Sequence, residues 1–126
     1  AIDKGKVLYQ DNEVWQNSID CALVLRGELI EEESEIAQEL VDLYVTAGET
    51  AELKDADTHE MSSKYMKVEK EVMDLSFQWI AYDELRINEE DYTELSNNLK
   101  EMGLQENPPT YEDFVNTTLF DNAKKK

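Results

Sequence analysis

The sequence predicts a mostly α-helical chain with about five helices and one or two short strands. From Glu31 onward the apolar residues recur with the period of an α-helix, and polar residues with capping spacing precede several of these segments. Residues 21–25 (CALVL), in contrast, form an unbroken apolar run with strand character that is too short for a helix of its own.

Two segments near the N-terminus are expected to be extended: residues 6–9 (KVLY) and residues 21–25. An internal strand with helices on one side only cannot close a sheet, because its backbone N–H and C=O groups need partners. The chain is therefore expected to be part of something larger. Cys21 is expected to be a small buried hydrophobic residue, and a catalytic thiol is the second interpretation.

The longest predicted helix begins near Glu31 and continues to about Glu52. Glutamates crowd its N-terminal end, where the helix dipole favours negative charge. One face, predicted to be the buried one, collects Ile36, Leu40, Leu43, Tyr44, Ala47 and Ala51.

Two shorter helices are predicted next. Asp57 and Glu60 have capping-box spacing, which predicts a helix with Met61 and Tyr65 facing inward. A further helix from about Glu69 places Val72, Leu75, Ser76 and Trp79 on one face. Residues 80–87 (IAYDELRI) are less regular and are expected to be extended.

The fourth and fifth helices have the clearest boundary signals. Asn88 is the predicted N-cap of the fourth helix, Asp91 occupies the capping-box position and Gly103 ends the helix. Its predicted core face consists of Tyr92, Leu95, Leu99 and Met102.

A proline pair, Pro108 and Pro109, interrupts the chain before the last helix. Thr110 and Asp113 are its predicted cap. The helix carries Phe114, Val115 and Leu119, and the final lysines, residues 124–126, are expected to be a frayed basic end.

Length and charge limit the possible functions. The 126 residues fit one domain with a moderate core. Twelve basic against thirty acidic residues give a formal net charge of −18, which argues against a nucleic-acid partner. The simplest interpretation of the acidity is solubility. No apolar run approaches the ~18 residues that a membrane span needs.

No pattern for catalysis is present in the sequence. His59 is the only histidine and Cys21 the only cysteine, so zinc spacing is absent. Calcium-loop, phosphate-binding and nucleophile-elbow motifs are absent as well. We therefore expect no cofactor and no resident metal, and we do not expect an enzyme.

Binding is the remaining class of function. Trp15, Asn17 and Ser18 combine a large aromatic side chain with two short hydrogen-bonding side chains, a mixture that small-ligand sites commonly use. The alternative is that Trp15 packs against a helix and the other two residues simply form a turn. Trp79, Tyr82 and Tyr92 are expected in the core.

Taken in order, several segments resemble one known family. They are GKVLY, the Trp-x-Asn turn, CALVLR, the glutamate-rich helix, WIAYDELRI and NPPTYEDF. This order resembles the C-terminal part of the sulfonate/nitrate/taurine (NMT1/THI5-like) substrate-binding proteins of ABC transporters. The resemblance covers nearly all of this chain but less than half of a complete family member. Where the family usually has proline, this chain has Gln16 and Ser34.

The resemblance implies an α/β receptor of the type II periplasmic-binding-protein class, with two lobes that close on a ligand by a hinge movement. Residues 1–13 would then end the second lobe and form the crossover, and residues 14–126 would return to the first lobe. It further implies a sulfonate, nitrate, taurine or pyrimidine-like solute bound by Trp15, Asn17 and Ser18. The partner would be a membrane permease, and the location extracytoplasmic, either periplasmic or lipid-anchored.

Two other functions stay open. One is a free-standing acidic helical module that binds a basic partner protein. The other is an enzyme of the pyrimidine-synthesising branch of the same fold, against which the single histidine argues. In the receptor interpretation, exposed strand edges and one-sided helices would also lead the isolated chain to self-associate.

Overall fold

Seven helices make up the regular structure of the computed structural model, which describes residues 21–125. They are α1 (Gly27–Glu32), α2 (Ser34–Glu52), α3 (Ala56–Tyr65), α4 (Lys70–Trp79), α5 (Glu89–Glu101), α6 (Tyr111–Phe114) and α7 (Thr118–Ala123). Helices account for 65% of the described residues, which contain no strand. The prediction of a mostly helical chain is confirmed, whereas the expected strand at residues 6–9 lies outside the described residues.

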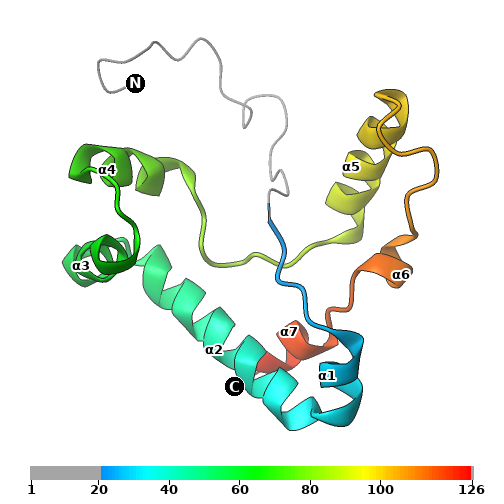
Figure 1. Cartoon of the computed structure of the whole chain (residues 1–126), viewed down its shortest axis with the longest axis horizontal. Coiled ribbons are helices and arrows are strands. Elements are labelled where there is room, and N and C mark those ends of the chain that lie inside the picture. The colour runs from blue at the N-terminus through cyan, green and yellow to red at the C-terminus, as the bar shows by residue number, and fades with distance from the viewer. Residues whose placement is uncertain (1–20, 126) are drawn as a thin grey trace.

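The long helix α2 organises the arrangement (Figure 1). The short helices α1 and α7 pack against α2, and α6 packs against α5. The pair α3 and α4 follows the C-terminal end of α2, and residues 80–88 then cross to the side of the molecule where α5 and α6 lie.

Residues 21–25 do not form the predicted strand. They have no regular secondary structure, because no strand among the described residues offers hydrogen-bonding partners for their backbone. Val24 is 83% exposed, and Cys21 is an exposed free thiol. The predicted burial of Cys21 is therefore also wrong in this structure.

Helix α2 buries a different face from the predicted one. Ala37, Val41 and Val45 are its buried residues, and they recur every four positions along one side of the helix. The predicted core residues Ile36, Leu40, Leu43, Tyr44 and Ala47 are exposed, and Ala51 is half-buried. The prediction failed because apolar residues occupy two neighbouring faces of α2, and helical periodicity does not tell which one a neighbour covers.

The start of α3 is displaced from the predicted cap. Asp55, not Asp57, is the N-cap, and its carboxylate accepts hydrogen bonds from the backbone N–H of Thr58 at 2.9 Å and from the Thr58 hydroxyl at 3.0 Å. Thr58 is the buried residue of α3, whereas Met61 and Tyr65, predicted to face inward, are exposed. The Thr58 hydroxyl is also within hydrogen-bond distance of the Thr50 carbonyl in α2, so the side of α3 that carries Thr58 faces α2.

Helix α4 begins directly after Glu69, as predicted. Its buried residues are Met73 and Phe77, whereas Val72 and Trp79 are exposed. The Phe77 ring lies 4.5 Å from the ring of His59 in α3 and 5.8 Å from the ring of Tyr82, both centroid to centroid and edge-on. A small aromatic cluster therefore joins α3, α4 and residues 80–87. Those residues are non-helical, as predicted, and form no strand.

Helix α5 confirms most of its prediction. The Asn88 side chain accepts a hydrogen bond from the backbone N–H of Asp91 at 2.9 Å. At the other end Gly103, with φ +68°, donates to the carbonyl of Lys100, and the next N–H donates to the carbonyl of Leu99. These two bonds form a Schellman motif. Tyr92 is buried as predicted, and Met102 is exposed.

The single last helix of the prediction is two helices in the structure. Thr110 caps α6 as predicted by accepting a hydrogen bond from the N–H of Asp113. The helix then stops at Phe114, which is exposed, and α7 begins at Thr118. Between them the Asn116 side chain accepts a hydrogen bond from the N–H of Thr118 at 3.0 Å, a local bond that competes with helix continuation.

Candidate functional site

The three residues predicted to bind a small solute, Trp15, Asn17 and Ser18, lie outside the described residues. Their assignment stays a prediction. Of the aromatic residues expected in the core, Tyr92 is buried and Tyr82 is half-buried, but Trp79 is 50% exposed at the end of α4.

A narrow crevice lies between α2, α7 and residues 82–85. Its lining residues are Tyr44, Val45, Tyr82, Asp83, Glu84, Leu85 and Phe120. The volume is about 10 Å³, which is room for about one water molecule. Small-ligand pockets are typically ~300–1,000 Å³. This crevice by itself therefore does not hold a solute such as a sulfonate.

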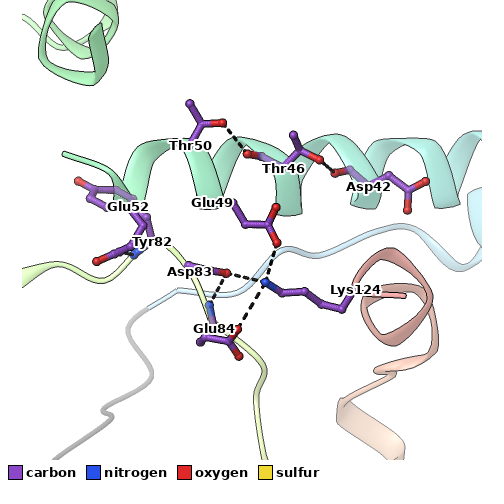
Figure 2. Close-up of polar contacts among 9 residues, drawn as sticks. All are labelled: Asp42, Thr46, Glu49, Thr50, Glu52, Tyr82, Asp83, Glu84 and Lys124. Atoms are coloured by element: carbon purple, nitrogen blue, oxygen red, sulfur yellow. Dashed lines mark hydrogen bonds and ion pairs between the residues drawn. The ribbon is translucent and has the colours of Figure 1, made fainter. Parts of the chain in front are cut away.

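One lysine joins three segments at the edge of this crevice, as Figure 2 shows. Lys124, the C-cap of α7, places its Nζ 2.8 Å from a carboxylate oxygen of Glu49 in α2. The same Nζ lies 2.7 Å from Asp83 and 3.6 Å from Glu84. We call these four residues the Lys124 junction.

The Lys124 junction shifts the pKa values of two of its members, Asp83 and Lys124. Hydrogen bonds from the ammonium group lower the pKa of Asp83 below its ordinary value, and the backbone N–H of Glu84 also contributes to this shift. The hydrogen bonds to Asp83 and Glu49 raise the pKa of Lys124 well above its ordinary value. Lys124 and Asp83 therefore stay an ammonium–carboxylate pair at neutral pH. Lys124 was predicted to be part of a frayed end, and that prediction is wrong.

A second cation fastens α7 to the same segment. Arg86 Nε lies 2.9 Å from Asp121 Oδ1, and the guanidinium also donates to the Thr117 hydroxyl at 3.1 Å. This pairing lowers the pKa of Asp121 and raises that of Arg86. Ion pairs of two cations thus bind α7 to residues 83–86. Lys124, at the end of α7, pairs with Asp83 and Glu84, and Arg86 pairs with Asp121 in α7.

A close backbone contact positions residues 82–85 on α2. A Cβ atom at Gly48 would lie 2.3 Å from the carbonyl oxygen of Tyr82, so only glycine fits there in this arrangement. The neighbouring N–H of Tyr82 donates to the Glu52 carboxylate at 2.6 Å (Figure 2). That hydrogen bond is the main reason why the pKa of Glu52 lies below its ordinary value.

The only histidine lies in a contact between α3 and α4. His59 Nδ1 is 3.2 Å from Asp74 Oδ1, and Asp74 also pairs with Lys70 at 2.6 Å. The Asp74 Oδ1 atom is buried and makes no hydrogen bond in the described structure.

Metal sites and membrane-spanning helices are two further features to consider in the described part of the chain. Residues 21–125 contain no group of three or more side chains that could hold a metal ion. Among these residues, no helix is long and apolar enough to cross a membrane. Comparisons of the chain with protein-family models, with curated proteins and with solved structures find no match.

The sequence does not predict these ion pairs, because the partners are remote along the chain. Lys124 is separated from Glu49 by 75 positions, and Arg86 from Asp121 by 35. One signal was available: a chain with thirty acidic residues and twelve basic ones has carboxylates near every cation. Composition of this kind predicts that a lysine is paired but not with which carboxylate.

Proposed function

We propose that this chain is the C-terminal region of the solute-binding component of an ABC importer. In this role it contributes one wall of a cleft in which a small anionic or heteroaromatic solute is captured for delivery to a membrane permease. This solute-binding component would act outside the cytoplasm.

One observation supports this proposal above the others. The face of α2 that carries Ile36, Leu40 and Leu43 is exposed, and residues 21–25 are apolar, have no regular secondary structure and pair with no strand among the described residues. Helices with an uncovered apolar face and a strand-like segment without partners are the elements of a layered α/β domain, in which a sheet covers the helices. A first lobe completed by other residues would supply that sheet.

The small volume of the crevice between α2, α7 and residues 82–85 is compatible with this role. A cleft between two lobes takes its walls from both, so the described residues need to supply only one side of it. The closing movement would bring the solute against Trp15, Asn17 and Ser18, the residues that the family resemblance implies.

Substitution in the complete receptor tests the proposal. Trp15→Ala and Asn17→Ala should weaken binding of the best ligand among taurine, an alkanesulfonate, nitrate and a pyrimidine by about tenfold or more, measured by calorimetry, because aromatic anchors dominate such sites. Trp79→Ala is the matched control: it removes a half-exposed tryptophan of α4 and should leave affinity unchanged. Unchanged affinity in the Trp15 and Asn17 variants would reject the site assignment.

A second function is favoured by a specific observation. Large apolar side chains lie exposed on a chain of formal net charge −18, a combination suited to a basic amphipathic partner protein. This acidic helical module would be a monomer that unfolds in one sharp transition without any missing sheet. Light scattering and calorimetry of the isolated chain separate the two functions, since an incomplete lobe would dimerise or unfold in a broad transition.

A further inference from the structure

We propose that residues 117–125, which contain α7, form a detachable strap that charged side chains hold over one apolar face of α2. The strap goes beyond the proposed function, because it concerns how much of α2 this chain exposes and not what the protein binds. We call these residues the C-terminal strap.

The strap covers the buried face of α2. Helix α7 packs on α2, whose buried residues are Ala37, Val41 and Val45. The other apolar face of the same helix, with Ile36, Leu40, Leu43 and Tyr44, is already exposed. Because the two faces are adjacent, release of the strap would join them into one continuous apolar surface on α2.

Helix α7 is too short to be stable by itself. It has six residues, and isolated helices shorter than ~12–15 residues are marginal in water. None of its residues is fully buried. Contacts with other elements must therefore hold it in place.

Several polar contacts hold it. Gln38 in α2 donates to the carbonyl of Leu119 at 2.9 Å, and Asn122 donates back to the Gln38 side chain at 3.3 Å. The remaining attachments are the Lys124 junction and the pair of Arg86 with Asp121. Among the apolar side chains of α7, Phe120 reaches the crevice next to Val45 and is half-buried.

Lys124 decides whether this arrangement is attractive or repulsive. Its ammonium group is the only cation within ion-pair distance of Glu49, Asp83 and Glu84 among the described residues. If that charge is neutralised, for example by acetylation, three carboxylates remain close together and repel one another. Salt would act in the same direction, since the Debye length falls from ~8 Å at 0.15 M to ~3 Å at 1 M.

Hydrogen exchange of the full chain tests the strap. In Lys124→Gln, the backbone amides of Asp121 and Lys124, which donate to Thr117 and Phe120, should exchange about fivefold to tenfold faster than in the wild type, the range expected for loss of a few surface ion pairs. The amides of α5 serve as the internal reference and should not change. Raising the salt from 0.1 M to 1 M should accelerate the same α7 amides in the wild type.

Two variants separate charge from other effects. Lys67→Gln removes the same charge in the segment between α3 and α4, where the exposed lysine makes no ion pair with any described residue, and should leave exchange in α7 unchanged. Lys124→Arg keeps the charge and should restore slow exchange. The strap is rejected if α7 exchanges equally fast in Lys124→Gln and wild type, or if α5 accelerates together with α7, because α7 would then not open on its own.

Discussion

Replacing Gly48 by alanine tests the contact that places residues 82–85 against α2. The new Cβ would lie 2.3 Å from the carbonyl oxygen of Tyr82, and ordinary contact begins at 3.4 Å. The segment would have to retreat by about 1 Å, the difference between these distances. Because the obstacle is backbone and not a rotatable side chain, no change of rotamer relieves the collision.

The magnitude follows from two opposing effects. Glycine in the middle of a helix is less stable than alanine by ~0.5–1 kcal/mol, so the substitution gains that amount in α2. Overpacking of a fitted contact costs ~1–3 kcal/mol. The expected net change is a destabilisation of up to ~2.5 kcal/mol, from the difference of these two estimates.

The retreat also has a local signature. It would lengthen the hydrogen bond from the Tyr82 N–H to the Glu52 carboxylate, which is 2.6 Å in the wild type. The pKa of Glu52 would then rise back toward its ordinary value of 4.5. Urea unfolding followed by circular dichroism measures the first effect, and carboxyl NMR titration measures the second.

Gly27 provides the matched control. It is the first residue of α1, and a Cβ atom there would meet nothing within 4 Å. Gly27→Ala should therefore be neutral or slightly stabilising. If Gly48→Ala is also stabilising and the pKa of Glu52 is unchanged, the close approach of Tyr82 to α2 does not exist in solution.

Three further predictions concern the rest of the chain. Stability should fall below about pH 4, because Asp83 and Asp121 have lowered pKa values and their pairing is lost as the pH drops through them; urea midpoints measured from pH 7 downward test this loss. Gly103→Ala should cost ~1–2 kcal/mol of unfolding free energy, since alanine is strained at φ +68°. Gly103→Asn should cost less, because asparagine tolerates this conformation better. Thermal unfolding that ranks the two variants in the reverse order would contradict the Schellman motif. Phe77→Ala should lower the free energy of unfolding by ~3–5 kcal/mol, because it empties a buried site. It should also shift the NMR signals of His59, the only histidine. Unchanged His59 ring signals would show that the two rings do not touch.

Most of the signals that act within a few residues were read correctly from the sequence, although the cap of α3 and the break at Asn116 were not. Asn88 and Thr110 cap their helices, Gly103 ends α5 and α4 begins after Glu69. Each of these features depends on a side chain or a φ angle and on backbone groups three or four positions away. Such bonds form in the same way whatever lies across the molecule.

Burial was predicted much less well. Cys21, Met61 and Tyr65 were expected inside and are exposed, and α2 turns the strip of Ala37 and Val41 inward in place of the richer face that begins at Ile36. Apolar periodicity indicates which faces of a helix are able to be buried. Which of them is covered depends on where α7 and residues 82–85 pack.

By itself, then, the sequence determined the mostly helical class of the chain, the caps of α5 and α6, the end of α5, and an acidity that disfavours nucleic acid. Only the tertiary structure decided that α7 returns to α2, that Lys124 meets carboxylates of two remote segments and that Gly48 has to lack a side chain. The physical reason is the distance along the sequence between the interacting residues. Caps and turns are satisfied by neighbouring residues, whereas packing and ion pairs join residues that are adjacent only after the chain has folded.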